Sequence, residues 1–252
     1  MRIFGLLGYP LHHSRSKEYF TAKFKNENIS ECVYENFSLE NISDLPNLLS
    51  ENTEIEGLNV TIPHKTAVID LIDETDVTAK AIGAVNCLKI SRNSGKISIK
   101  GFNTDAEAFR QSIEPMLSKF RGKAIILGTG GSSKAVSYAL SEMNIPHVFV
   151  SRNPFHKDHI SYNEIDAVLL KEYKLIINCT PTGMFPYIDK APALPYEALN
   201  NEHILFDLVY NPEETLFLKK AKAQGASIKN GLEMLYLQAK ASWKIWNSDE
   251  IS

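Results

Sequence analysis

Residues 123–152, KAIILGTGGSSKAVSYALSEMNIPHVFVSR, decide the fold of this chain. They begin with a short apolar run at 124–127, pass through a glycine-rich turn, and end with a second apolar run at 147–150. Between the runs, apolar residues recur at helical spacing: Ala135, Val136, Ala139, Leu140 and Met143. A strand, a turn, a helix and a second strand within about 30 residues are typical of a βαβ unit. We therefore expect a parallel sheet with crossover helices.

The glycine-rich turn reads Gly128-Thr129-Gly130-Gly131-Ser132. Its first glycine permits a tight turn, and the second lets the backbone approach a pyrophosphate. The start of the following helix would supply N–H groups and the positive end of its dipole. Ser133 stands where the usual fingerprint has its third glycine. The turn predicts a dinucleotide site; the alternative is a plain tight turn in a sheet that binds no nucleotide.

The end of the second strand indicates which dinucleotide is bound. An acidic residue there would bind the ribose hydroxyls of NAD, but this chain has Ser151-Arg152-Asn153. A guanidinium is suited to a 2′-phosphate, and no carboxylate stands in these three positions to repel that group. His156 and Lys157 would add positive charge. The sequence therefore favours NADP, unless Arg152 is an ordinary solvated surface arginine.

The first hundred residues predict a different, mixed sheet. Strands are expected at 3–7, 33–37 and 58–61, and a helix is expected at 16–26. Apolar runs at 84–90 and 97–102 flank Asn93-Ser94-Gly95, which indicates an antiparallel hairpin. This feature suggests that a first domain ends near residue 102. A last helix from 232 to about 246 has one apolar face, and we expect it to pack back on the first domain.

Length and composition exclude several classes of protein. The 252 residues suffice for one or two domains, and 44% apolar with 23% charged residues is ordinary for a globular protein. A net charge of −3 provides no bulk attraction to nucleic acid or anionic membranes. Three widely separated cysteines fit a reducing compartment and lack metal-binding spacing. No apolar run approaches the ~20 residues of a membrane span, so we expect a cytoplasmic protein.

Polar residues mark a second candidate site in the first domain. Ser14 and Ser16 lie near a predicted helix start, where both hydroxyls could reach one carboxylate; the alternative is that Ser16 caps the helix. Pro63 predicts the first turn of another helix, and Lys65 would lie in that turn. The helix dipole disfavours a cation there and would ease loss of its proton, as a general acid/base requires. The alternative is an exposed, solvated lysine.

Two more polar side chains belong to the same candidate site. Asn86 interrupts an apolar run, and a buried amide needs hydrogen-bond partners. Asp105 follows the hairpin, where it is either a helix cap or the carboxylate that orients Lys65.

Taken together, these motifs resemble the shikimate dehydrogenase family. The resemblance covers nearly the whole chain in family order, which is more specific than any single motif. Its blocks are Gly8-x-Pro10-x-x-His13-Ser14-x-Ser16, residues 57–65 (GLNVTIPHK), 83–86 (GAVN), 101–105 (GFNTD), the turn at Gly128, 178–184 (NCTPTGM), 207–212 (DLVYNP), and 230–235 (NGLEML) with Gln238.

The resemblance implies NADPH-dependent reduction of 3-dehydroshikimate to shikimate, in aromatic amino-acid biosynthesis. It implies a catalytic pair, Lys65 and Asp105. The substrate would be bound by Ser14, Ser16, Thr61, Lys65, Asn86, Asp105, Tyr210 and Gln238. The cofactor would be bound by Gly128, Thr129, Gly130, Gly131, Ser132, Ser151, Arg152, Asn153, Thr180, Val209, Gly231 and Met234.

The family has two α/β domains with a cleft between them and a C-terminal helix that returns to the first. We accordingly expect a substrate domain at 1–103 plus 232–252 and a Rossmann-like domain at 104–231, in a monomer or homodimer without nucleic-acid or membrane partners. The chain departs from the family at Lys17, Phe20, Ser151 and His156. Two rival functions are a quinate/shikimate dehydrogenase that uses NAD and a noncatalytic metabolite-binding relative.

Overall fold

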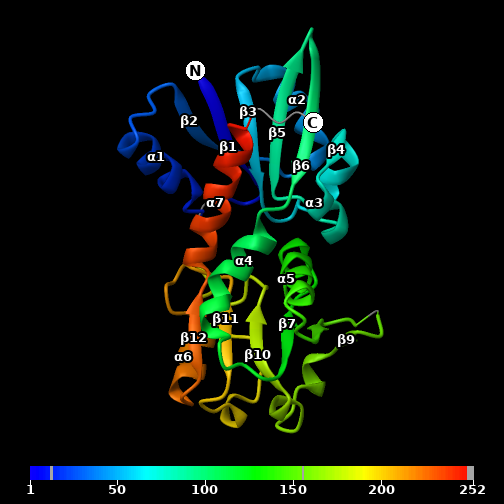
Figure 1. Cartoon of the computed structure of the whole chain (residues 1–252), viewed down its shortest axis with the longest axis vertical. Coiled ribbons are helices and arrows are strands. Elements are labelled where there is room, and N and C mark those ends of the chain that lie inside the picture. The colour runs from blue at the N-terminus through cyan, green and yellow to red at the C-terminus, as the bar shows by residue number, and fades with distance from the viewer. Residues whose placement is uncertain (12–13, 155, 249–252) are drawn as a thin grey trace. The chain divides into compact units, whose positions relative to one another are not determined.

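A computed structural model describes residues 1–11, 14–154 and 156–248 of the chain. The chain forms two compact units, each built around its own sheet (Figure 1). The first unit comprises Met1–Asp105 and Tyr236–Ser252, and the second comprises Ala106–Leu235. Each unit carries one of the two candidate sites.

The first unit contains a mixed six-stranded sheet in the order β2-β1-β3-β5-β6-β4. Strands β2, β1 and β3 run parallel, whereas β5 is antiparallel to both β3 and β6. The strands are β1 (Arg2–Gly8), β2 (Cys32–Ser38), β3 (Ile55–Val60), β4 (Glu74–Thr75), β5 (Cys87–Asn93) and β6 (Lys96–Phe102). The predicted hairpin is confirmed: Asn93 pairs with Lys96, and Ser94 and Gly95 both adopt positive φ in the two-residue turn.

The helices of the first unit include α1 (Ser16–Asn26), whose bounds agree with the prediction. The others are α2 (Leu45–Glu51), α3 (Val77–Ile82) and the start of α4 (Asp105–Ile113), with short 3-10 turns at Ile42–Asp44 and Ala67–Leu71.

The helix predicted from Pro63 is wrong, because the segment forms turns and then only the 3-10 turn at Ala67–Leu71. The carbonyl of Lys65 accepts a 2.7 Å bond from the Val85 N–H and is therefore not part of a helical ladder. Lys65 consequently lies in an irregular turn before the 3-10 segment and not in the first turn of a regular helix, so the dipole argument for its reactivity no longer applies.

Helix α7 (Leu232–Trp246) packs its C-terminal half against the sheet of the first unit, as predicted. Trp246 stacks on Phe4 with ring centroids 4.9 Å apart, and its Nε1 donates to the Leu88 carbonyl at 2.9 Å. Gly57 in β3 makes this contact possible, because a Cβ there would lie 2.4 Å from the Trp246 ring. The glycine of the 57–65 block therefore serves packing.

The second unit contains an all-parallel sheet in the order β12-β11-β10-β7-β8-β9, a Rossmann-like arrangement (Figure 1). Its strands are β7 (Lys123–Leu127), β8 (His147–Val150), β9 (His159–Ile160), β10 (Tyr173–Asn178), β11 (Ile204–Asp207) and β12 (Ser227–Asn230). The expected α/β class and βαβ unit are thus confirmed. The chain order reverses between β7 and β10, and open sheets bind ligands at such a switch point.

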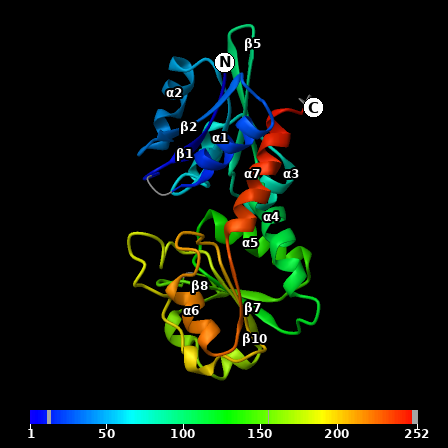
Figure 2. The same ribbon diagram turned by 90° about the vertical axis from the view of Figure 1, so that its left-hand side faces the viewer.

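Two helices of the second unit, α5 (Gly131–Glu142) and α6 (Leu216–Ala223), follow β7 and β11. Helix α6 lies against β11 and β12 (Figures 1 and 2). Further 3-10 turns lie at Glu114–Met116, Tyr162–Glu164, Leu169–Lys171 and Tyr196–Ala198. Within the described ranges, no helix is both long and apolar enough to cross a membrane.

Candidate functional site

Lys65 and Asp105 form an ion pair in the first unit. Lys65 lies between β3 and the 3-10 turn at Ala67–Leu71, and Asp105 is the first residue after the β6 segment to enter α4. The Lys65 Nζ to Asp105 Oδ2 distance is 2.6 Å, and the side chains are only 12% and 6% exposed. Such a pair is costly to bury and is unlike the exposed ion pairs of the same chain. The structure thus brings together the two residues predicted as catalytic.

Asn86 holds the other oxygen of this carboxylate. Its Nδ2 donates to Asp105 Oδ1 and to Thr104 Oγ1, both at 2.9 Å, and its Oδ1 accepts the Thr104 N–H at 2.7 Å. The Asp105 N–H is bound by the side chain of Asn103 at 3.1 Å. Both oxygens of Asp105 therefore bind side chains, and of the two alternatives for this residue the geometry supports the one in which it orients Lys65.

Asn59 is a polar residue of this unit to which the sequence analysis assigned no role. Its Oδ1 accepts from the Tyr34 hydroxyl at 2.9 Å, and its Nδ2 donates to Ser242 Oγ at 2.7 Å. Ser242 in turn donates to the carbonyl of Gln238 at 3.0 Å, so Asn59 connects β3 to the turn of α7 that carries Gln238. An amide within an apolar strand is the same signal that singled out Asn86.

Thr61 directly follows β3, the parallel neighbour of β1, and Ser14 and Ser16 lie where the chain after β1 enters α1. A Cβ at Gly8 would lie 2.4 Å from Thr61 Cγ2, so this glycine leaves room for Thr61. Ser14 Oγ accepts the Ser16 N–H at 3.2 Å. The N-cap of α1 is Arg15, so the alternative in which Ser16 caps the helix is wrong. His13 of the resemblance block lies outside the described residues.

The glycine-rich turn of the second unit has the geometry of an anion cradle. Gly128 adopts φ +103°, which side-chain-bearing residues rarely adopt. Gly130 is the N-cap of the 12-residue helix α5, with no side-chain cap and open space where a Cβ would be. Gly131, Ser132 and the exposed Thr129 complete the turn. Backbone N–H groups at a helix start fit a pyrophosphate, so these residues suit a dinucleotide.

The switch point lies between this turn and the loop after β10. A Cβ at Gly128 would lie 3.0 Å from Thr180 Cγ2, so Thr180 borders the turn. On the side of β8, Ser151 and Asn153 form a small turn, with the Asn153 N–H bonded to Ser151 Oγ at 3.2 Å. This turn leaves Arg152 exposed. Its exposure leaves open both alternatives, a phosphate ligand and a solvated arginine. His156, one of the departures, packs its ring 5.0 Å from that of His159.

A buried polar cluster, Asn178, Asp207 and Thr215, lies at the carboxyl ends of β10 and β11. Asp207 Oδ1 accepts from Asn178 Nδ2 and from the Val209 N–H, both at 3.0 Å, and Oδ2 accepts from Thr215 Oγ1 at 2.6 Å. All three side chains are fully buried. Burial raises the pKa of Asp207 to about 6, and its hydrogen bonds to Thr215, Val209 and Asn178 oppose that rise. None of the three is among the predicted site residues, although Asn178 and Asp207 stand in the resemblance blocks 178–184 and 207–212.

The remaining predicted cofactor residues lie beside this cluster. Gly231 is in close contact with the chain, because a Cβ there would lie 2.2 Å from the Leu208 carbonyl oxygen. The Gly231 N–H donates to the Val209 carbonyl at 3.3 Å, and Val209 and Met234 are buried. Tyr210 follows directly and is half-buried.

Comparisons with known proteins show which proteins this chain is similar to. Residues 6–88 match the family described as shikimate dehydrogenase substrate binding domain. A shikimate dehydrogenase (NADP(+)) from Methanococcus vannielii is 34% identical over 97% of this chain and 90% of the relative.

Solved structures are similar over comparable lengths. The shikimate 5-dehydrogenase of Thermus thermophilus, in complex with NADP(H) and shikimate, has a TM-score of 0.83 at 30% identity and covers 98% of this chain and 94% of its own. A quinate dehydrogenase from Corynebacterium glutamicum in complex with NAD has a TM-score of 0.81 at 25% identity, over 98% and 93% of the two chains.

Proposed function

This chain belongs to the shikimate dehydrogenase family, and from that premise we propose how its residues serve the family's reaction. It is an NADP-dependent oxidoreductase that reversibly reduces 3-dehydroshikimate to shikimate, a step of aromatic amino-acid biosynthesis. The observation that carries the assignment of roles is the buried Lys65–Asp105 pair.

Lys65 is the general acid of the reduction. When bound, NADPH supplies the hydride that reduces the C3 carbonyl carbon. Negative charge then develops on the carbonyl oxygen, and the Lys65 ammonium donates a hydrogen bond and then a proton to it. In the reverse direction the neutral amine accepts that proton. Asp105 keeps the ammonium in place through the 2.6 Å contact, and Asn86 keeps Asp105 in place. A group fixed before the reaction needs no reorganisation as the charge develops.

The other polar residues bind the substrate. In the family's pattern Ser14 and Ser16 hold the carboxylate, and Tyr210 contributes to the same group. The ring hydroxyls are bound by Thr61, Asn86, Asp105 and Gln238. The contacts among Lys65, Asn86 and Asp105 support this assignment, because they already form one hydrogen-bonded group.

The second unit binds the cofactor. Gly128, Thr129, Gly130, Gly131 and Ser132 would hold the pyrophosphate at the start of α5. Arg152, with Ser151 and Asn153, would bind the 2′-phosphate. Thr180, Val209, Gly231 and Met234 would contact the nicotinamide half. The order of the strands supports this: Arg152 follows β8, the glycine turn follows β7, and the others follow β10, β11 and β12 in turn across the sheet.

We also propose a division into domains, a location and an assembly state. The substrate domain is 1–103 plus 232–252 and the NADP domain is 104–231, close to the compact units of the structure. The location is the cytoplasm, supported by three cysteines that form no disulfide in the described part of the chain. The protein acts as a monomer or homodimer on small molecules.

A matrix of activities tests the proposed function. Purified protein is assayed with shikimate or quinate, each with NADP⁺ or NAD⁺, by the absorbance of the reduced nicotinamide. We expect the highest kcat/KM with shikimate and NADP⁺. Higher kcat/KM with quinate and NAD⁺ would instead assign the chain to the activity named for the Corynebacterium glutamicum relative. Binding of shikimate and NADP⁺ without turnover would indicate a noncatalytic metabolite-binding protein.

A further inference from the structure

The polar cluster Asn178–Asp207–Thr215 is built around a carboxylate whose recorded partners in the described part of the chain are all neutral. Its donors are an amide, a hydroxyl and a backbone N–H, each within 3.0 Å. Asn178 and Asp207 are direct partners in the parallel register of β10 and β11, so they end neighbouring strands at the ligand-binding edge of the sheet. Each of these two side chains forms hydrogen bonds with the loop that follows its own strand.

Asn178 sets the shape of the loop after β10. Its Oδ1 accepts from both the N–H and the hydroxyl of Thr180, at 3.1 and 2.6 Å, and its Nδ2 donates to the Thr182 carbonyl at 3.2 Å. The same Nδ2 donates to Asp207. The amide therefore joins the Thr180 loop to the Asp207 carboxylate, and Thr180 borders the glycine-rich turn.

Asp207 sets the shape of the loop after β11. It binds the Val209 N–H on one oxygen and Thr215 on the other, so it connects the beginning and the end of residues 208–215. Thr215 is also the N-cap of α6, where its hydroxyl accepts from the Leu218 N–H. The loop is thus anchored to a helix as well as to two strands.

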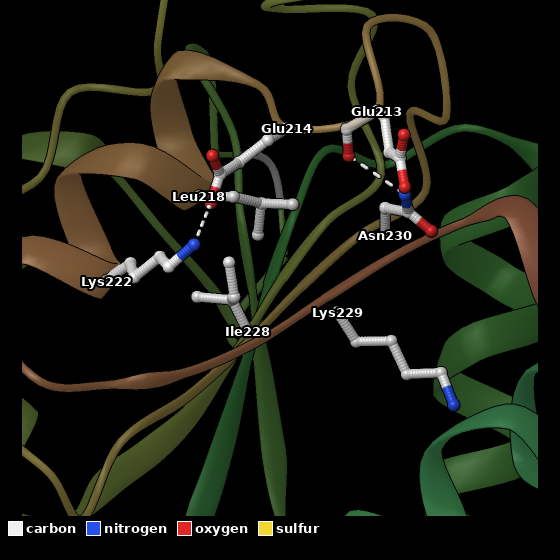
Figure 3. Close-up of a pocket in the computed structure, with 7 residues that line it drawn as sticks. All are labelled: Glu213, Glu214, Leu218, Lys222, Ile228, Lys229 and Asn230. Carbon is white, nitrogen blue, oxygen red and sulfur yellow. Dashed lines mark hydrogen bonds and ion pairs between the residues drawn. The ribbon is translucent and has the colours of Figure 1, made fainter.

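The end of β12 is tied to the same loop. Asn230 Nδ2 donates to the Glu213 carbonyl at 2.8 Å, beside a surface hollow lined partly by α6 residues (Figure 3). The next residue, Gly231, donates its N–H to the Val209 carbonyl and is in close contact with Leu208. Thr180, Val209 and Gly231 therefore belong to a single bonded assembly.

We propose that Asp207, acting with Asn178 and Thr215, is a positioning residue for the nicotinamide half of the cofactor. This inference rests on the proposed function, because that function assigns Thr180, Val209 and Gly231 to the nicotinamide. Asp207 touches neither substrate nor reacting atoms; it acts through the backbone of the loops that do. Hydrogen bonds to an ionised carboxylate are stronger than those between neutral groups, so this charge stiffens both loops.

Binding of two ligands distinguishes a specific effect on the nicotinamide half from a general loss of structure. NADP⁺ contains the nicotinamide half, whereas adenosine 2′,5′-bisphosphate contains only the adenosine and its phosphates. We expect Asp207→Ala to weaken NADP⁺ binding about tenfold or more and to lower kcat, because a misplaced nicotinamide reacts slowly. Binding of adenosine 2′,5′-bisphosphate should stay within about twofold of the wild type. Calorimetry measures both dissociation constants, and steady-state kinetics gives KM and kcat.

Variants with matched chemistry complete the test. Asp207→Asn keeps an oxygen for Asn178 and Val209 and an N–H for Thr215, so it should retain more NADP⁺ affinity than Asp207→Ala. Thr215→Val removes both the bond to the carboxylate and the N-cap bond of α6, whereas Thr215→Ser keeps both. If Asp207→Ala does not fold, only Thr215→Val of this second pair should weaken NADP⁺ binding while it leaves adenosine 2′,5′-bisphosphate binding within about twofold. Glu172 is an exposed carboxylate that directly precedes β10, at the opposite end of that strand from Asn178. As the control, Glu172→Ala should bind both ligands as the wild type does.

These measurements distinguish a failure of the proposed function from a failure of the positioning role. A wild-type protein that binds neither ligand would contradict the proposed function. A wild-type protein that binds both, combined with variants that lose the two ligands equally or lose neither, would contradict only the positioning role. Equal impairment of Asp207→Asn and Asp207→Ala would also contradict it.

Discussion

Two aspartates at the ligand-binding ends of the two sheets differ in what surrounds them. Asp105 is bound by the ammonium of Lys65 and by Asn86, whereas Asp207 is bound by neutral donors alone. Both are almost completely buried. A carboxylate with a cation can hold that cation for proton transfer, whereas a carboxylate with neutral donors can only orient them. In our proposals the same residue type therefore serves chemistry in one unit and geometry in the other.

The largest effect should come from breaking the charged pair. Lys65→Ala removes the proton donor and leaves Asp105 without its cation, so we expect kcat to fall about 10²- to 10⁴-fold. Steady-state absorbance assays with saturating 3-dehydroshikimate and NADPH measure the fall in kcat. Lys80→Ala, an exposed lysine of the same unit, serves as the control. A near-normal kcat for Lys65→Ala would refute the role of Lys65.

The second effect concerns Asp207, whose partners are neutral donors, and the pH dependence of stability. The folded-state pKa of Asp207, about 6, is above the ordinary value of about 3.9, so its stabilising contribution is complete at low pH and is lost as pH rises through 6. The free energy of unfolding of the wild type, relative to Asp207→Asn, should fall by about 2 kcal/mol between pH 4.5 and 7.5. Urea denaturation at several pH values measures it.

A second group that changed its charge near Asp207 between pH 4.5 and 7.5 would also alter the measured free energy of unfolding. Tyr196 is the titratable neighbour that interacts electrostatically with it in the described part of the chain, and burial raises the pKa of Tyr196 above its ordinary value. The tyrosine therefore stays neutral throughout this range. A pH-independent difference between the two proteins would show that the carboxylate does not change its charge there.

The third effect sharpens the comparison within the second unit. We propose Arg152 for the adenosine side and Asp207 for the nicotinamide side, so Arg152→Ala should raise the KM for NADPH about tenfold and change the KM for NADH little. Arg121→Ala, an exposed arginine near the opposite edge of the same sheet, provides the control. An equal effect on both cofactors would remove the argument for recognition of the 2′-phosphate.

The smallest effect concerns a buried hydroxyl that, unlike either aspartate, has no hydrogen-bond partner among the described residues. Ser133 Oγ and His159 Nδ1 are the buried side-chain polar atoms without a hydrogen bond in the described residues. We expect Ser133→Ala to raise the free energy of unfolding by about 1 kcal/mol, because an unsatisfied buried polar group is destabilising. Thermal and urea denaturation measure the change; a destabilised variant would show that the hydroxyl is satisfied in solution.

The fold was predictable from periodicity because strands and helices differ in their apolar spacing. The βαβ unit, the hairpin and α1 follow from such local patterns. The predicted helix after Pro63 failed because a long-range bond between Val85 and Lys65 replaces the local ladder there. No local pattern encodes that bond.

The candidate site divides in the same way. Residue types in sequence determined that a lysine, an amide and a carboxylate were available, and that Arg152 follows a nucleotide turn. Only the tertiary structure decided that Lys65 and Asp105 meet at 2.6 Å, and that Asp207 is bound by neutral donors alone. The physical reason is that hydrogen bonding and desolvation depend on atoms brought together by folding, whereas periodicity depends on neighbours along the chain.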